Sequence, residues 1–409
     1  MILRFARFAA LFFLACGSCT GGQQAAIQKQ EGAAQGAPDE QRALAIDQIK
    51  ETVVFFQTSY LESGQRKAWS GTGFFIHAVD PRIPGRGCVW LVTNKHMLHP
   101  PDRPYFDAVV VRANTKELGP QGEHYVDLTL PVKDNAGALY WITDPDDETV
   151  DLALFRLLPD ESKLDVRWIS VDSFATKEVF TKLRINENDE VLFAGLFTAY
   201  PGAKRNFPIV RHGKIALVTD ERVPTNPRDP RQTVELILAE VTSFGGNSGS
   251  PVFARIGGVR EGAATASLGG YSYYLLGVMQ GFFLERSDIV LELTTTIQGS
   301  VGQNSGIAGV VPADKILRIL ATRHARAMTD LAVAGVFRNE GRFAEAEQLY
   351  EAAIAALETA AGKGHPHVAA ALEEYALFLR KTGRYGEAKR AESRAKLIWE
   401  KAGQPAVRP

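Results

Sequence analysis

The spacing of hydrophobic and polar positions changes twice along this chain. Residues 8–15 form one short, unbroken apolar run. Between about residues 50 and 312, short β-branched and aromatic runs alternate with Gly, Pro, Asn and Asp, as in strands joined by turns. From Ile316 to about residue 402, apolar positions recur every three or four residues, which is the period of amphipathic helices. The pattern therefore predicts a short leader, a region of strands and a region of helices.

The middle region contains many short strand-like runs and no sustained helical period. Such a pattern predicts an antiparallel all-β sandwich or barrel. The clearest runs are residues 52–56, 73–76, 89–93, 106–112, 152–157, 190–194, 234–238 and 274–283.

The helical region contains an internal repeat. The stretch Gly-Arg-Phe-Ala-Glu-Ala-Glu at residues 341–347 recurs as Gly-Arg-Tyr-Gly-Glu-Ala-Lys at residues 383–389. Glycine can end one helix, the aromatic residue packs into the next, and small alanines let helices approach closely. With His-Pro-His-Val-Ala at residues 365–369, the repeat resembles the tetratricopeptide repeat of kinesin light chains, which implies two helical hairpins that bind a protein partner. An unrelated helical bundle is the alternative.

Two hairpins are fewer than a free-standing solenoid needs. We therefore expect a helix near residues 313–323, or the β region itself, to cover one end of the repeats.

The first residues have the pattern of an export signal. Two arginines precede the apolar run and small residues follow it, whereas a membrane-spanning helix needs about 20 apolar residues. Leu-Ala-Cys at residues 14–16 resembles the bacterial lipobox, which implies lipidation of Cys16 and membrane contact through that anchor alone. An ordinary signal peptide, cut near Ala15 or Ser18, is the alternative. We expect the mature protein in the cell envelope or periplasm, or secreted.

Composition and charge limit the function classes. The 409-residue chain has 46 basic and 47 acidic side chains, for a formal net charge of -1. Because phosphate contacts need a basic surplus or patch, this balance argues against nucleic-acid binding. Beyond the leader the sequence has one cysteine, Cys88, so no intrachain disulfide is expected. We see no metal-ligand spacing and no phosphate-binding loop, and we expect neither a metal nor a cofactor.

One glycine-rich stretch carries the strongest chemical signal. Gly-Asn-Ser-Gly-Ser-Pro at residues 246–251 runs into an apolar strand. A serine hydroxyl becomes a nucleophile when it lies beside a base and near backbone N–H groups that hold an oxyanion, and glycines permit the tight backbone this needs. The stretch resembles the nucleophile motif of trypsin-like bacterial serine peptidases. The resemblance implies that Ser248 is the nucleophile and that the N–H groups of Gly246 and Ser248 form the oxyanion hole.

The serine needs a base, and His96 is the best match. It follows an apolar strand that ends in Thr-Asn-Lys-His, which resembles the histidine motif of the same family, with a Gly-Thr-Gly-Phe-Phe-Ile strand at residues 71–76 before it. His77 and His99 lie nearby and are expected at the surface or in loops.

A carboxylate is expected behind the histidine, where it holds the imidazole in one tautomer. Asp151 begins Asp-Leu-Ala-Leu, which resembles the family's aspartate motif. Burying an unpaired carboxylate there would be costly, so a partner is expected. Asp144, Asp146 and Asp147 precede it and are expected in a solvated acidic turn.

Chain order separates the peptidase folds. His96, Asp151 and Ser248 follow the order of the chymotrypsin double β-barrel, whereas α/β-hydrolases run Ser, Asp, His and subtilisins run Asp, His, Ser. The resemblance therefore implies a multidomain chain, an all-β double barrel followed by all-α repeats, which hydrolyses peptide bonds through an acyl-enzyme. The expected segments are a signal peptide at 1–19, a flexible linker at 20–45, a peptidase domain at 46–325, tetratricopeptide repeats at 326–403 and a tail at 404–409.

Specificity is harder to derive from the sequence. In the family, the primary pocket is lined by the residue six before the serine and by the strand after it, which here are Thr242 and residues 277–281, with Met279 at a specificity position. Neither place supplies an acidic residue, so we expect an uncharged, apolar side chain before the cleaved bond. The alternative to a peptidase is an inactive peptidase-fold scaffold in the envelope whose repeats recruit a partner.

Overall fold

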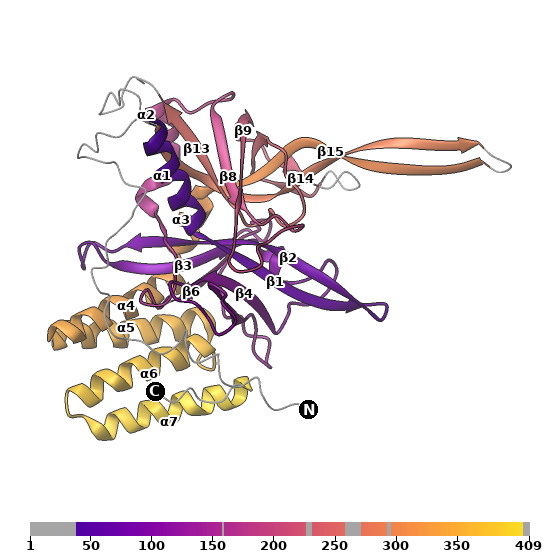
Figure 1. Ribbon diagram of the computed structural model, residues 1–409. Coiled ribbons are helices and arrows are strands. Elements are labelled where there is room, and N and C mark those ends of the chain that lie inside the picture. The colour runs from indigo at the N-terminus through magenta and orange to yellow at the C-terminus, as the bar shows by residue number, and fades with distance from the viewer. Residues whose placement is uncertain (1–37, 158, 226–230, 258–270, 293–295, 404–409) are drawn as a thin grey trace.

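The computed structural model describes residues 38–157, 159–225, 231–257, 271–292 and 296–403 (Figure 1). The predicted signal peptide, its lipidation candidate Cys16 and most of the predicted linker lie outside these residues. Helix α1 (Pro38–Glu51) begins inside the predicted linker, which is a correction to that boundary. The helix forms because its last turns carry an apolar anchor: Ile49 is completely buried in the core.

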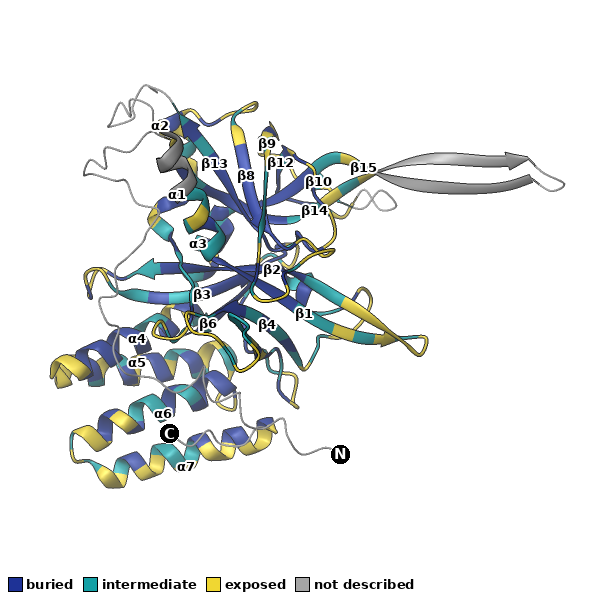
Figure 2. Cartoon of the chain, viewed as in Figure 1, coloured by how far each residue is buried: buried dark blue, intermediate teal, exposed yellow. Residues whose placement is uncertain are grey.

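The first sheet lies at the start of the described chain and has seven strands, in the order β5-β4-β1-β2-β3-β6 with β7 added beside β2. Its central strands are buried on both faces (Figure 2). In β1, Val53 and Phe55 enter one hydrophobic cluster, while Val54 and Phe56 enter another. The strands are β1 (Val53–Glu62), β2 (Gln65–Val79), β3 (Gly87–Thr93), β4 (Ala108–Asn114), β5 (Tyr125–Pro131), β6 (Ala153–Leu157) and β7 (Ile169–Ser170).

The second sheet closes into a barrel, in the order β12-β15-β14-β13-β8-β9. Its interior is a separate apolar cluster that includes Phe193, Val252 and Met279. Strands β14 and β15 continue past the barrel as a two-stranded arm (Figure 1). The barrel strands are β8 (Glu190–Gly195), β9 (Ile209–Leu217), β12 (Ile237–Glu240), β13 (Pro251–Gly257), β14 (Tyr271–Glu292) and β15 (Thr296–Pro312), with a small pair of β10 (Val223–Pro224) and β11 (Thr233–Val234) beside it.

Two 3₁₀ helices and six further α-helices complete the described part of the chain. They are the 3₁₀ helices η2 (Lys95–Leu98) and η3 (Val171–Ser173), then α2 (Lys177–Leu183), α3 (Ala313–Leu320), α4 (Arg323–Glu340), α5 (Phe343–Ala361), α6 (Pro366–Lys381) and α7 (Tyr385–Ala402). No helix in the described part of the chain has the length and apolar character to span a bilayer.

The repeats form two helical hairpins, α4–α5 and α6–α7, as the sequence predicts. Gly341 and Gly383 take the left-handed backbone at the turns, with φ of 81° and 79°. Alanines such as Ala334, Ala353 and Ala376 are essentially fully buried where the helices meet. The prediction of an all-β region followed by paired helices is therefore confirmed.

The repeats pack against the first sheet, so the β region covers one end of them. Helix α4 contacts β3, and Trp90 shares a hydrophobic cluster with Leu331. Arg82 pairs with Asp330 at 2.7 Å, and another pair links Arg86 of the β region to α4. Helix α3 occupies the range near 313–323 where a helix was expected, and Thr322 caps the start of the next helix, α4. The shared cluster makes the repeats part of one core with the β region.

Candidate active site

His96 lies on the 3₁₀ helix η2, directly after β3. The apolar residues of β3 hold the chain in the core, and Met97 and Leu98 on the same turn are buried beneath it. The side chain of Asn94 donates a hydrogen bond to the carbonyl of Asp151 at 2.8 Å, which ties the turn to the start of β6. With its neighbours buried, the His96 side chain remains 34% exposed.

Asp151 reaches His96 because β3 and β6 are neighbours in the sheet. Thr93 pairs with Ala153, so the ends of the two strands lie side by side. The carboxylate then makes two contacts: Oδ1 accepts from the backbone N–H of His96 at 3.0 Å, and Oδ2 lies 2.6 Å from His96 Nδ1. A carboxylate on Nδ1 fixes the tautomer that leaves Nε2 available to accept a proton. The structure thus brings two of the three predicted residues into direct contact.

The pKa of His96 is set by opposing influences. Burial of the ring is the largest single influence and lowers the pKa, because it disfavours the charged form. The charge of Asp151 and its hydrogen bond act in the other direction and prevail, so the pKa of His96 is raised. A raised pKa makes the imidazole a stronger base and stabilises the imidazolium that forms when it accepts a proton.

Ser248 lies on the tight loop that precedes β13. Gly246 and Gly249 have φ of 97° and 84°, a backbone region that side chains disfavour. A Cβ on Gly249 would lie 1.9 Å from the carbonyl oxygen of Thr72, so the glycine is needed for close approach as well as for the turn. Asn247 braces the loop: its Oδ1 accepts from the N–H of Phe244 and its Nδ2 donates to the carbonyl of Leu196, both at 2.8 Å.

Strand β2 locks this loop to the first sheet. The N–H of Thr72 donates to the carbonyl of Ser248 at 2.8 Å. The Thr72 hydroxyl donates to the carbonyl of Gly246 at 2.8 Å and accepts from the N–H of Leu196 at 3.0 Å. With the carbonyls of Gly246 and Ser248 engaged, no hydrogen bond from a described residue reaches their N–H groups. The oxyanion hole at these two N–H groups stays a prediction.

The Ser248 hydroxyl donates to the carbonyl of Gln280 at 3.1 Å. Within the described residues, no hydrogen bond joins it to His96. Gln280 and His96 both line a pocket of about 300 Å³, so the residue that accepts from Ser248 lies on the same cavity as the histidine. A hydroxyl that rotates about one bond can exchange one acceptor for another, and catalytic hydrogen bonds often tighten only when substrate binds.

Apolar side chains dominate the wall of this pocket. They come from the barrel strands and the segment before β12 and include Leu236, Phe282, Phe283 and Leu284. The two predicted specificity residues do not line it. Met279 is fully buried in the barrel core, and Thr242 is exposed outside the pocket.

The structure corrects two smaller expectations. His77 is 6% exposed, since it lies on β2 against Trp168, with ring centroids 5.8 Å apart. Asp144 is 2% exposed and its buried carboxylate pairs at 3.1 Å with Arg318 of α3, whose side chain is partly exposed, while Asp146 is exposed as expected.

Sequence reasoning missed the supporting residues. The loop that carries Ser248 is held by Thr72, Asn247 and Gln280. In the sequence, each of them looks like an ordinary strand or turn residue. It also missed a cluster of His324, His365 and His367, which the fold assembles from distant positions. The only sequence signal was the alternation of histidines in the stretch at residues 365–369.

Comparison with known proteins agrees with this architecture. The trypsin-like peptidase domain model matches residues 71–259, and the tetratricopeptide repeat model matches residues 325–400. The chain thus contains a trypsin-like peptidase domain at residues 71–259, followed by a tetratricopeptide repeat region at residues 325–400.

Other comparisons add little. No curated protein sequence matches the chain. Among solved structures, an inactive mutant form of Rv3671c from M. tuberculosis H37Rv is similar at 16% identity with a TM-score of 0.34, over 71% of this chain and 96% of that chain.

Proposed function

We propose that this protein is an exported serine endopeptidase that cleaves peptide bonds through Ser248, His96 and Asp151. The observation that carries the proposal is the double contact of Asp151 with His96, at 3.0 and 2.6 Å, beside a pocket lined by Gln280, whose carbonyl accepts from Ser248. A peptidase domain implies a protein or peptide substrate, and tetratricopeptide repeats generally mediate protein interactions, so we assign partner binding to the repeats.

The proposed reaction follows from the positions of these groups. Ser248 Oγ leaves the Gln280 carbonyl and attacks the substrate carbonyl, while Nε2 of His96 takes its proton. The N–H groups of Gly246 and Ser248 hold the oxyanion. His96 then returns the proton to the leaving amine, and a water molecule repeats the sequence on the acyl-enzyme. No metal or cofactor takes part.

The pocket supports a preference for apolar side chains. Its aromatic and aliphatic wall, which includes Leu236, Phe282 and Phe283, can bury a hydrophobic group beside His96. We therefore propose substrates with an uncharged, apolar residue at the position before the cleaved bond, as the sequence suggested.

One observation favours a second function. The Ser248 hydroxyl is already engaged by the Gln280 carbonyl. If that hydrogen bond persists with substrate present, the domain is an inactive scaffold and the repeats are its working surface.

Hydrolysis of a peptide library separates the two functions. Wild-type protein should cleave apolar peptides, Ser248→Ala should not, and the matched surface variant Ser162→Ala should cleave as wild type does. If none of the three folded proteins cleaves any peptide, the inactive scaffold is supported. The full chain is required, because Trp90 and Leu331 share one cluster and deletion of the repeats would expose it.

Export and lipidation are also proposals. They rest on the leader pattern and on Cys16. Mass spectrometry of the mature amino terminus tests them: a diacylated cysteine at position 16 supports the anchor, and a free amino terminus near Ala15 or Ser18 supports a plain signal peptide.

A further inference from the structure

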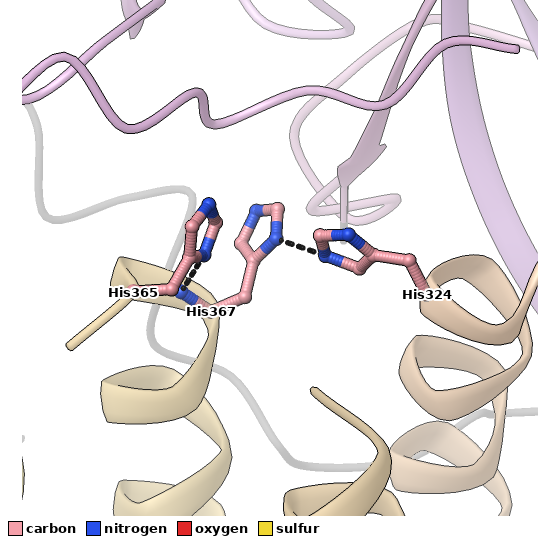
Figure 3. Close-up of side chains that lie close together, drawn as sticks. All are labelled: His324, His365 and His367. Carbon is pink, nitrogen blue, oxygen red and sulfur yellow. Dashed lines mark hydrogen bonds between the residues drawn. The ribbon is translucent and has the colours of Figure 1, made fainter. Parts of the chain in front are cut away.

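Three histidines meet where the repeats touch the peptidase domain (Figure 3). One ring nitrogen from each of His324, His365 and His367 lies within 4.8 Å of the other two. His324 Nε2 and His367 Nδ1 are 2.8 Å apart, and the ring centroids are separated by 4.7 to 5.6 Å. None of these residues has a part in the proposed peptidase reaction.

The repeat architecture explains the meeting. His324 lies in the first turn of α4, and His365 and His367 flank the first turn of α6. Because α4 and α6 are the equivalent first helices of successive hairpins, their amino-terminal ends lie near one another. His365 also caps α6: its Nδ1 accepts from the N–H of His367 at 3.1 Å, with Pro366 at the first helical position.

A loop of the peptidase domain encloses the cluster. His365 and His367 are only 9% and 8% exposed. The carbonyls of Leu139 and Tyr140 hydrogen bond to His365 and His367, respectively. A backbone carbonyl that holds the second nitrogen of an imidazole is the usual support of a metal-binding histidine.

A metal ion binds the neutral imidazole, through the ring nitrogen that carries no proton.

We propose that His324, His365 and His367 bind one zinc-like divalent transition-metal ion at the junction between the repeats and the peptidase domain. In tetrahedral coordination with Zn–N distances of about 2.0–2.1 Å, ligand nitrogens lie roughly 3.3 Å apart. The His324–His367 pair opens by about half an ångström to admit the ion, and His365 moves closer and exchanges one hydrogen bond for the metal. Water completes the fourth position.

The nature of the ligands selects the metal class. Imidazole nitrogens favour Zn²⁺, Co²⁺, Ni²⁺ and Cu²⁺, whereas Mg²⁺ and Ca²⁺ need oxygen ligands. The charge of Asp134 acts on His365 and attracts a cation, whereas the charge of Arg156 acts on His367 in the opposite direction.

The position of the site gives the metal a structural role. It would join the first turns of α4 and α6 beneath the loop that carries Leu139 and Tyr140. Another contact fixes the same loop to the end of α7, where the N–H of Asn135 donates to the carbonyl of Ala402 at 3.2 Å. Bound metal would thus fix the two hairpins to each other at the place where this loop of the peptidase domain rests on them.

Cobalt titration of the untagged full-length protein tests the proposal without any activity measurement. One equivalent of Co²⁺ should give the intense visible bands of a tetrahedral site, and Zn²⁺ should displace it. Zn²⁺ should also raise the melting temperature, and Mg²⁺ should leave it unchanged. His324→Gln and His365→Asn should each weaken Zn²⁺ binding by about 100-fold or more. Asn retains the helix cap, so that variant should remain folded.

A matched variant completes the test. His124→Gln removes a histidine outside the cluster and should bind Zn²⁺ as wild type does. The proposal fails if wild type shows no stoichiometric site, which would make the cluster a hydrogen-bond network only. It also fails if the His324 and His365 variants, folded by circular dichroism, bind Zn²⁺ with wild-type affinity.

Discussion

Replacing Asp151 by asparagine changes the proton position on His96 while it leaves the size of the side chain unchanged. The carboxylate accepts twice, from the backbone N–H and from Nδ1 of His96. An amide has one oxygen and one NH₂ group. Since the backbone N–H can only donate, the oxygen turns to it and the NH₂ faces Nδ1. Nδ1 must then accept, and the proton moves to Nε2, the nitrogen that should receive the proton of Ser248.

The expected loss follows from this wrong tautomer. In Ser-His-Asp enzymes it lowers kcat by ~10⁴-fold. At 1.36 kcal/mol for each factor of ten, the loss corresponds to about 5.4 kcal/mol of transition-state stabilisation. KM should change little, because Asp151 is not on the pocket wall.

The pH dependence of activity provides an independent test of the role of Asp151. Burial lowers the pKa of His96, and Asp151 raises it above the usual value. The reaction needs neutral His96, so activity falls as pH drops through that pKa. Removing the charge leaves burial unopposed, and the acidic limb of kcat/KM should move to lower pH in Asp151→Asn.

Peptide hydrolysis across a pH series measures both effects. Asp146→Asn is the matched control, because Asp146 lies in the preceding loop and its side chain is 76% exposed. The control should keep wild-type rates. The reasoning is refuted if a folded Asp151→Asn protein retains more than about a tenth of wild-type kcat, or if its acidic limb moves to higher pH.

Three further predictions concern the serine loop and the repeats. Thr72→Val removes the hydroxyl that holds the Gly246 carbonyl. In steady-state kinetics, kcat should therefore fall by about 10- to 100-fold while KM stays similar. An unchanged kcat would contradict the role of Thr72. Gly249→Ala places a methyl group 1.9 Å from a backbone oxygen, at a position with positive φ. Urea unfolding should show a free energy of unfolding lower by roughly 2 kcal/mol or more. A variant as stable as wild type would show that the loop is not so constrained. Burial raises the pKa of Glu373 to about 7 despite the hydrogen bond from Trp399, so its ionisation removes stability as pH rises from about 4.5 through 7. Glu373→Gln should therefore raise the melting temperature more at pH 8 than at pH 5, and an equal change at both would refute this.

The fold was largely predictable where both faces of an element are buried. Strand β3 is apolar almost throughout because Trp90 and Leu91 enter different clusters, and such a run is visible in sequence. Strands β5 and β9 were missed because polar and charged residues alternate with apolar ones on exposed faces, as in Tyr125–Pro131. Helix α1 was not predicted, because its sequence continues a Gln- and Ala-rich stretch in which the buried residue Ile49 does not stand out.

The site was predictable to the extent that its chemistry sits in contiguous motifs. His96 and Asp151 each adjoin an apolar strand, and sheet pairing then brings them into contact. The groups that hold Ser248 could not be found this way, because Thr72 and Gln280 come from strands far away in sequence. The three-histidine cluster has the same origin: helix packing, and not spacing along the chain, unites its members.

The central claim is that Ser248 is a nucleophile activated by His96. Reaction of the full chain with a fluorophosphonate, followed by mass spectrometry of its peptides, tests this most directly. We predict a single adduct on the peptide that contains Ser248, formed much more slowly in His96→Ala. An unlabelled Ser248 in folded wild-type protein, or labelling that is equally fast without the histidine, would contradict the account.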